Sequence, residues 1–245
     1  MTPRLEAVYF DDGPYDDFAR LARVLEHTAD QHCGGWRRAI TRLDPPRRRA
    51  GSSSMVANTV KLNRWCDLVA SAEDGEQILL LDTDTALLRA IDAIWERPFD
   101  VAYATKVHDF QFNLGVFFLR VTARVRTLFE TWRAENARLF RTWSEDPTWR
   151  TRYGGVNQAS FGSLIQTGAL EGVDVCELAC AEWNCEESAW PAFDPAVTRI
   201  LHLKGALRRS VFHRQTPPAD LLPAVSAWRQ LDRESRRGAK AAAAS

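Results

Sequence analysis

The segment Ile78–Thr85, with the sequence ILLLDTDT, constrains the fold more than any other part of the chain. Its four consecutive apolar residues, Ile78–Leu81, are expected in a strand that is buried on both faces of a parallel sheet. Asp82 and Asp84 follow directly, one residue apart. Because unpaired buried carboxylates are costly, two of them at the end of such a strand predict a bound cation. Carboxylate oxygens suit Mg2+ or Mn2+, typically together with water and substrate phosphates.

Strands and helices alternate around this segment, which predicts an α/β fold with an open, mostly parallel sheet flanked by helices. The predicted strands are Leu5–Phe10, Arg37–Leu43, Ile78–Leu81, Val101–Thr105, Leu114–Leu119, Val173–Leu178 and Arg199–Leu203. The predicted helices are Phe18–Ala29, Met55–Ala72, Ala86–Trp95, Arg124–Arg141 and Asn157–Gln166, with a short helix after Gln215. Ligands of open α/β sheets bind outside the carboxyl ends of the strands, so the acidic pair lies where a site is expected.

Charge and composition exclude several other classes of protein. Lys and Arg number 32, as do Asp and Glu, so the formal net charge is zero, which argues against nucleic-acid binding. No apolar run approaches the ~20 residues needed to cross a bilayer, and no secretory signal is visible at the start. The five Cys residues form an odd set, which is typical of reduced thiols. We therefore expect a soluble cytoplasmic protein without a transmembrane segment.

The same acidic motif resembles the opening motif of the haloacid-dehalogenase-type phosphatases. In that family Asp82 would be the nucleophile that forms an aspartyl phosphate. The family places this motif near the start of its chain and needs a later acidic cluster. Here 77 residues precede the strand, and the downstream Asp residues are isolated in the sequence. A phosphatase is therefore the second interpretation.

A resemblance to the nucleotide-sugar-dependent glycosyltransferases of the Rossmann-like GT-A fold is broader, because six segments occur in that family's order. These segments are Leu5–Asp12, Ile78–Thr85, Phe112–Arg120, Gly154–Gln158, Ala181–Cys185 and Ile200–Gly205. The resemblance is closest to the retaining glycogenin-like and lipopolysaccharide galactosyltransferase-like branches. The last segment continues into Arg208 and Arg209, where the family has a longer ending with Lys, Pro and Trp.

The resemblance implies a role for each candidate site residue. It assigns a Mn2+ or Mg2+ ion to Asp82, Asp84 and His202. It assigns the nucleotide sugar to Asp11, Asp12, Lys61, Asp82, Thr83, Asp84, Asn113 and Lys204. It assigns catalysis at the sugar to Asn157 and Gln158. Structural alternatives are a helix cap at Asp84, a packed His202, a turn at Asp11 and Asp12, and solvated lysines at 61 and 204. Trp183 and Trp190 are candidates either for acceptor stacking or for the core, and His108 and Asp109 for contacts with sugar hydroxyls.

The resemblance also implies a single GT-A domain over residues 1–215, with a small antiparallel portion on the acceptor side. Residues 216–245 would form a C-terminal helix and a frayed tail. The implied reaction transfers a sugar from a nucleotide-diphosphate donor, with a UDP-sugar favoured, to an unidentified glycan, protein or small-molecule acceptor. Retention of configuration is expected because neither Asn157 nor Gln158 can act as a base. The alternative bases are Glu182, Glu186 and Glu187, and the non-enzymatic alternative is a nucleotide-sugar-binding module without turnover.

Overall fold

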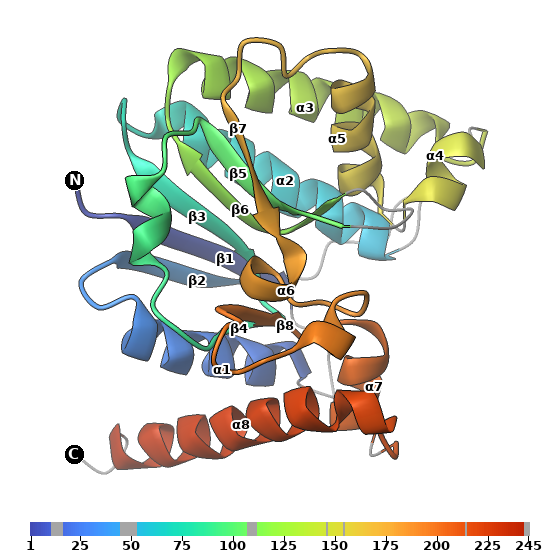
Figure 1. The fold of residues 1–245 in the computed structure, drawn as a ribbon. Coiled ribbons are helices and arrows are strands. Elements are labelled where there is room, and N and C mark those ends of the chain that lie inside the picture. The colour runs from blue at the N-terminus through green and yellow to red at the C-terminus, as the bar shows by residue number, and fades with distance from the viewer. Residues whose placement is uncertain are drawn as a thin grey trace.

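The computed structural model describes residues 1–10, 17–44, 53–106, 112–145, 147–153, 155–213 and 215–242. The predicted α/β fold is confirmed: a sheet with the strand order β2-β1-β3-β6-β5-β7 lies between helices (Figure 1). Its strands are β1 (Arg4–Phe10), β2 (Arg37–Leu43), β3 (Gln77–Asp82), β5 (Val101–Thr105), β6 (Phe112–Arg120) and β7 (Val175–Ala179). β6 runs antiparallel to both of its neighbours, β3 and β5, and the other adjacent pairs are parallel.

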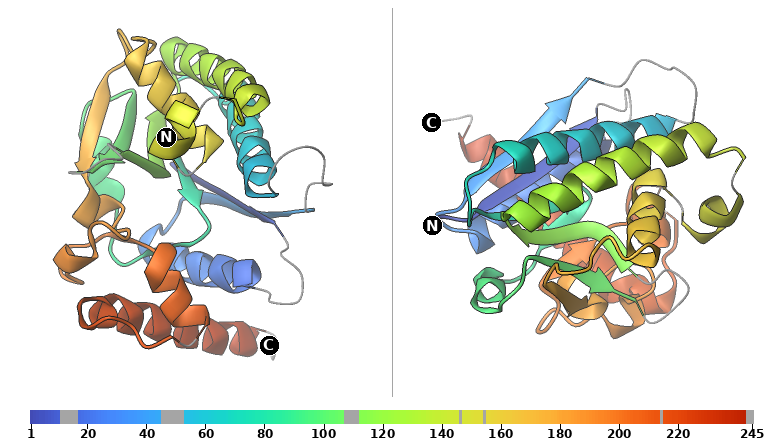
Figure 2. Two further views of the ribbon diagram at one scale, coloured as in Figure 1. Left: turned by 90° about the vertical axis from the view of Figure 1, so that its right-hand side faces the viewer. Right: turned by 90° about the horizontal axis from the view of Figure 1, so that it is seen from above.

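Helices cover both faces of this sheet, as two perpendicular views show (Figure 2). The helices α2 (Ser53–Ser71), α3 (Ala123–Thr142) and α5 (Val156–Gln166) lie on one face, and α1 (Asp17–His32) lies on the other. The side chains of β6 alternate between the two layers. Phe117 packs with Trp132 and Phe161 in one core, whereas Phe118 packs with Trp183 in the other. This alternation explains why the run Val116–Leu119 of this strand is wholly apolar: both faces of the strand are buried there.

A second, two-stranded antiparallel sheet lies beside the main one, formed by β4 (Thr85–Leu87) and β8 (Ile200–His202). It confirms the small antiparallel portion that we expected. The predicted helix at Ala86–Trp95 is wrong, because this segment contains β4 and then the 3-10 helix η1 (Asp92–Glu96). The strand partner of β4 is remote in sequence, so no local periodicity indicates the pairing.

The C-terminal helix α8 (Leu222–Ala242) is longer than the short helix that we predicted. It lies along α1, where Trp228 and Val225 share a buried cluster with Leu21 and Val24. At this interface Arg20 donates two hydrogen bonds to Asp232, of 2.9 and 2.7 Å. The shorter elements of the second half are α4 (Pro147–Arg152), α6 (Cys180–Trp183), η2 (Trp190–Ala192), α7 (Gly205–Phe212) and η3 (Ala219–Leu221). The division at residue 215 stays a prediction. Within the described residues, no helix has the length and apolarity required to cross a membrane.

Candidate functional site

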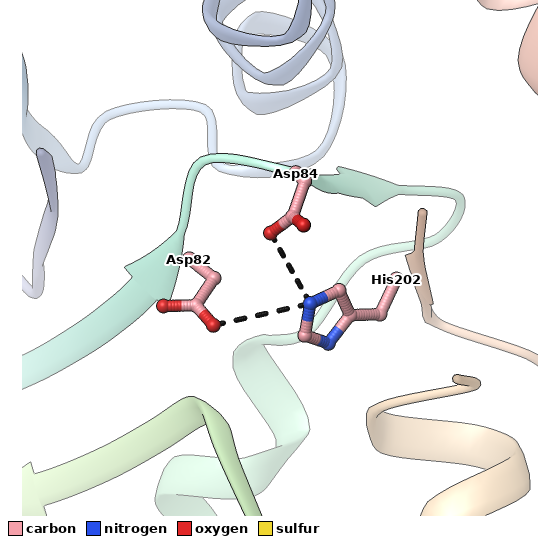
Figure 3. A group of neighbouring side chains, drawn as sticks. All are labelled: Asp82, Asp84 and His202. Carbon is pink, nitrogen blue, oxygen red and sulfur yellow. Dashed lines mark hydrogen bonds and ion pairs between the residues drawn. The ribbon is translucent and has the colours of Figure 1, made fainter. Parts of the chain in front are cut away.

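The two sheets together bring Asp82, Asp84 and His202 into one group (Figure 3). Asp82 is the last residue of β3, and the chain then turns into β4, whose first residue Thr85 pairs with His202 of β8. Each of the three residues offers one ligand atom within 4.8 Å of the others. His202 Nε2 lies 3.2 Å from Asp84 Oδ1 and 3.9 Å from Asp82 Oδ2. Two carboxylates and an imidazole in this arrangement are a chemically reasonable ligand set for a divalent cation.

The hydrogen bonds of His202 indicate which ring nitrogen carries a proton, and which one has a lone pair that points toward the carboxylates. Asn184 donates from Nδ2 to the backbone oxygen of Asn113 and to its Oδ1, at 3.2 and 3.1 Å, so its own Oδ1 is an acceptor. That oxygen lies 2.9 Å from His202 Nδ1, which therefore carries a proton. In the neutral ring, Nε2 then presents a lone pair toward Asp84 and Asp82. Two acceptors facing each other repel, and a cation or a second proton removes that repulsion, so the donor set fits a metal ion.

Gly115 makes room for the imidazole. A Cβ atom built on Gly115 would lie 2.4 Å from His202 Cε1 and 2.8 Å from its Nδ1, and 2.9 Å from Asn113 Oδ1. Side chains at that position would therefore displace the ring or the strand. The glycine of the FNLG segment on β6 is thus required by the close approach of β8.

Asp84 is surrounded by positive charge. Burial raises the pKa of its carboxyl group, but when His202 carries a second proton, on Nε2, its charge and its hydrogen bond to Asp84 outweigh this effect. With the charges of Arg208 and Lys204, they lower the pKa of Asp84 to about 2. Arg208 Nη1 lies 3.9 Å from Asp84 Oδ2, and its guanidinium group stacks over the Phe18 ring at 4.4 Å. Arg208 was not among the residues predicted for the site, although it belongs to the basic pair that follows the last motif.

Asp82 forms an ion pair with Lys61 of α2. The Lys61 side chain is 10% exposed, and its Nζ atom lies 4.7 Å from the centroid of the Trp65 ring. A buried lysine held between a carboxylate and an indole ring is not a solvated surface charge. The alternative that we considered for Lys61 is therefore wrong.

A pocket of about 560 Å³ opens beside Asp82 and brings together predicted residues from five parts of the chain. The predicted residues that line it are Lys61, Asp82, Asn113, Asn157, Gln158 and Lys204. Other polar residues on its wall, which the sequence analysis did not assign to it, are Asn58, Lys106 and Ser188. Glu186 and Glu187, which we considered only as alternative bases, also line it. The pocket is polar on several sides, as expected of a site for a hydroxyl-rich or phosphorylated ligand.

Other predicted residues have different surroundings. The Thr83 side chain is buried and donates a hydrogen bond of 2.8 Å to the backbone oxygen of Val8, so its hydroxyl group is used inside the fold. Trp183 and Trp190 are both 2% exposed, as expected of core residues. Gln158 Oε1 accepts a hydrogen bond of 3.2 Å from the Leu114 backbone N–H. Asp11, Asp12, His108 and Asp109 lie outside the described residues.

Comparison with known proteins identifies the fold. No protein-family model matches the sequence, and no curated protein matches it. Among solved structures, one similar chain is a glycosyltransferase involved in the glycosylation of the major capsid of PBCV-1. It has a TM-score of 0.54 and 12% identity, with 85% of this chain and 98% of that chain covered. The galactosyltransferase LgtC, in complex with donor and acceptor sugar analogues, has a TM-score of 0.52 and 12% identity, with 94% and 95% covered.

The glycosyltransferase GlyE of Streptococcus pneumoniae TIGR4 has a TM-score of 0.54 and 11% identity over 95% of this chain, which spans 60% of GlyE. Identities of 10–12% establish similarity of fold and leave the reaction to be argued from the site. The chain therefore has the GT-A-like fold of these glycosyltransferases, as the resemblance of its motifs predicted.

Proposed function

We propose that this protein is a metal-dependent glycosyltransferase that takes a sugar from a nucleotide-diphosphate donor, most simply a UDP-sugar. The observation that carries this proposal is the Asp82–Asp84–His202 group at the edge of the polar pocket. It is supported by the fold, because similar chains of known structure are glycosyltransferases. The acceptor is a hydroxyl-bearing molecule that enters the same pocket.

The metal-binding side of the pocket would hold the diphosphate. Asp82, Asp84 and His202 are the residues that would ligate Mn2+ or Mg2+, and a bound cation supplies positive charge next to the departing diphosphate. Lys204 lines the pocket, and Arg208 lies close to Asp84. Both positively charged side chains are available to bind phosphate oxygens, and Arg208 would do so with its planar fork of N–H donors. Lys61 is paired with Asp82 and therefore orients that carboxylate.

The amide-lined part of the pocket would hold the sugar. It is lined by the amide side chains of Asn58, Asn113, Asn157 and Gln158. An amide cannot remove a proton from an acceptor hydroxyl group at neutral pH, so we propose retention, with the departing phosphate taking that proton. Gln158 Oε1 keeps one lone pair beyond its bond to Leu114, which is available to support positive charge developing on the sugar.

The phosphatase alternative receives less support from the site. Among the described residues, Asp82, Asp84 and His202 form the single group of three or more potential metal ligands. The later acidic cluster that this class of enzyme needs therefore has no counterpart of three or more ligand residues in the described part of the chain.

The test is a product assay with a panel of UDP-sugars and Mn2+, in which proton NMR follows UDP release and the configuration of the new sugar product. We expect turnover of at least one UDP-sugar, by transfer or slow hydrolysis, with the α configuration of the donor retained. Gln158→Ala should lower kcat more than it raises the Kd of the donor, because its contact matters chiefly in the transition state. Asp82-dependent hydrolysis of simple phosphomonoesters without UDP-sugar turnover would contradict the proposal. Donor binding without turnover would instead indicate a binding module.

A further inference from the structure

The pocket contains an ion pair for which the chemistry above has no use. Lys106, directly after β5, places its Nζ atom 2.6 Å from Glu186 Oε1, and the two side chains are only 11% and 3% exposed. Removing both charges from water costs several kcal/mol, and such pairs often stabilise a protein no more than apolar residues would. Both residues line the pocket. A buried pair on the wall of a ligand site is better explained by what it binds than by stability.

Glu186 has one oxygen atom in use and one available. Lys106 Nζ, the Ser188 backbone N–H at 3.3 Å, and the Ser188 hydroxyl group all donate to Oε1. From the described part of the chain, no hydrogen bond reaches Oε2. Burial raises the pKa of the Glu186 carboxyl group, but hydrogen bonds from Lys106 and Ser188 outweigh this and lower it. Glu186 therefore offers an ionised carboxylate on the pocket wall, with one oxygen atom to which a ligand can donate.

The pair selects for a hydroxyl group. A hydroxyl group both donates and accepts, so it can donate to Glu186 Oε2 and accept from Lys106 Nζ. A carboxylate on the ligand would face the charge of Glu186, and an ammonium group would face that of Lys106. Like charges brought together in this way cost several kcal/mol. The amide side chains of Asn113 and Gln158 add neutral hydrogen-bonding groups to the wall of the same pocket.

The position of the pair relates it to the transferred sugar. Glu186 lies two residues after Asn184, whose amide group contacts both His202 and Asn113. The pair is therefore joined through a short, buried segment to the candidate metal site, where the bond between sugar and phosphate would lie. We propose that Lys106 and Glu186 form the selectivity element of the subsite for the transferred sugar, and that this sugar is uncharged and presents a hydroxyl group to the pair. This inference rests on the proposed function.

Calorimetric binding without an acceptor tests the proposal. UDP, UDP-glucose, UDP-galactose and UDP-glucuronate are titrated with Mn2+ into the wild type, Glu186→Gln, Lys106→Met and a control. The control, Asp67→Asn, removes a carboxylate from the exposed Arg133–Asp67 pair, whose atoms are 2.6 Å apart. We expect the wild type to prefer at least one neutral UDP-sugar over UDP-glucuronate by about 10-fold or more. Glu186→Gln should reduce this ratio of affinities about 10-fold. Lys106→Met should weaken the binding of the neutral UDP-sugars. The affinity for UDP itself should be unchanged in all variants.

The outcomes separate the inference from the proposed function. The selectivity role is overturned if Glu186→Gln keeps the wild-type affinity for UDP and also the wild-type ratio of affinities for neutral UDP-sugar and UDP-glucuronate. The role is also overturned if a variant loses affinity equally for UDP and for every UDP-sugar and has a lower Tm, because the pair is then structural. If the wild type does not bind UDP in the presence of Mn2+, the proposed function fails, and the inference fails with it. That failure is seen before any variant is compared.

Discussion

Replacing Gly115 with alanine tests the close packing that places His202 at the candidate metal site. The new Cβ atom would lie 2.4 Å from His202 Cε1, against an ordinary contact of 3.4–4 Å. The ring or strand β6 must therefore shift by about 1 Å. His202 is 1% exposed, so the ring has no open space to enter. Overpacking of this kind costs about 1–3 kcal/mol, which lowers the Tm by about 2–4 °C for each kcal/mol in a chain of this size.

The same shift should disrupt metal binding more than it disrupts the fold. Metal–ligand distances tolerate about 0.2 Å, so a displacement of about 1 Å removes His202 from the ligand set. We expect Gly115→Ala to lower Mn2+ affinity, measured calorimetrically with UDP present, by at least about 10-fold. Chemical denaturation of the same preparation gives the change in stability. The control is Gly34→Ala, because Gly34 is exposed and a Cβ atom there meets nothing within 4 Å. Wild-type stability and wild-type Mn2+ affinity in Gly115→Ala would refute the reasoning.

Two further predictions concern the hydrogen bonds around His202 and the interface of α8. Asn184→Ala removes the acceptor that lies 2.9 Å from His202 Nδ1. It should lower the Mn2+ affinity about 10–100-fold in the same calorimetric titration. An unchanged affinity would show that packing alone orients the ring. Asp232→Asn leaves Arg20, Arg23 and Arg236 without their shared carboxylate and should lower the free energy of unfolding by about 1–3 kcal/mol at pH 7. Burial raises the pKa of Asp232, but Arg20 and Arg236 lower it below the ordinary 3.8. Its stabilising contribution is therefore complete above about pH 4 and lost as the pH falls through the lowered value, so the difference between wild type and variant should narrow in acid; a constant difference down to about pH 2 would contradict this.

Features set by local sequence were predictable. The apolar run Ile78–Leu81 and the acidic residues after it indicate a buried strand and a candidate cation site within eight residues. The strand β6 is apolar on both faces because it is covered on both sides, and its run of apolar residues indicates this. The glycine at position 115 belongs to a recognisable motif, although the reason for it, the His202 ring, is visible only in three dimensions.

Features set by tertiary pairing were not predictable from the sequence. β4 has three residues and is a strand only because β8 lies beside it, so its segment was assigned to a helix. The same holds for four residues around the pocket. Lys106 follows β5, whereas Asn184, Glu186 and Arg208 lie far from it in the second half of the chain. No spacing rule relates a residue after β5 to one after α6, and their pairing depends on the parallel pairing of β5 with β7, the strand that leads into α6.

The central claim is that Asp82, Asp84 and His202 bind a nucleotide diphosphate through a divalent cation, and one titration tests it most directly. UDP affinity is measured calorimetrically for wild type and Asp84→Asn, each with Mn2+ and with EDTA. The account predicts that Mn2+ strengthens UDP binding to the wild type by about 10-fold or more and has no effect on a folded Asp84→Asn variant. Equal Mn2+-dependent affinity in the two proteins, or UDP binding to the wild type that EDTA does not weaken, would contradict it.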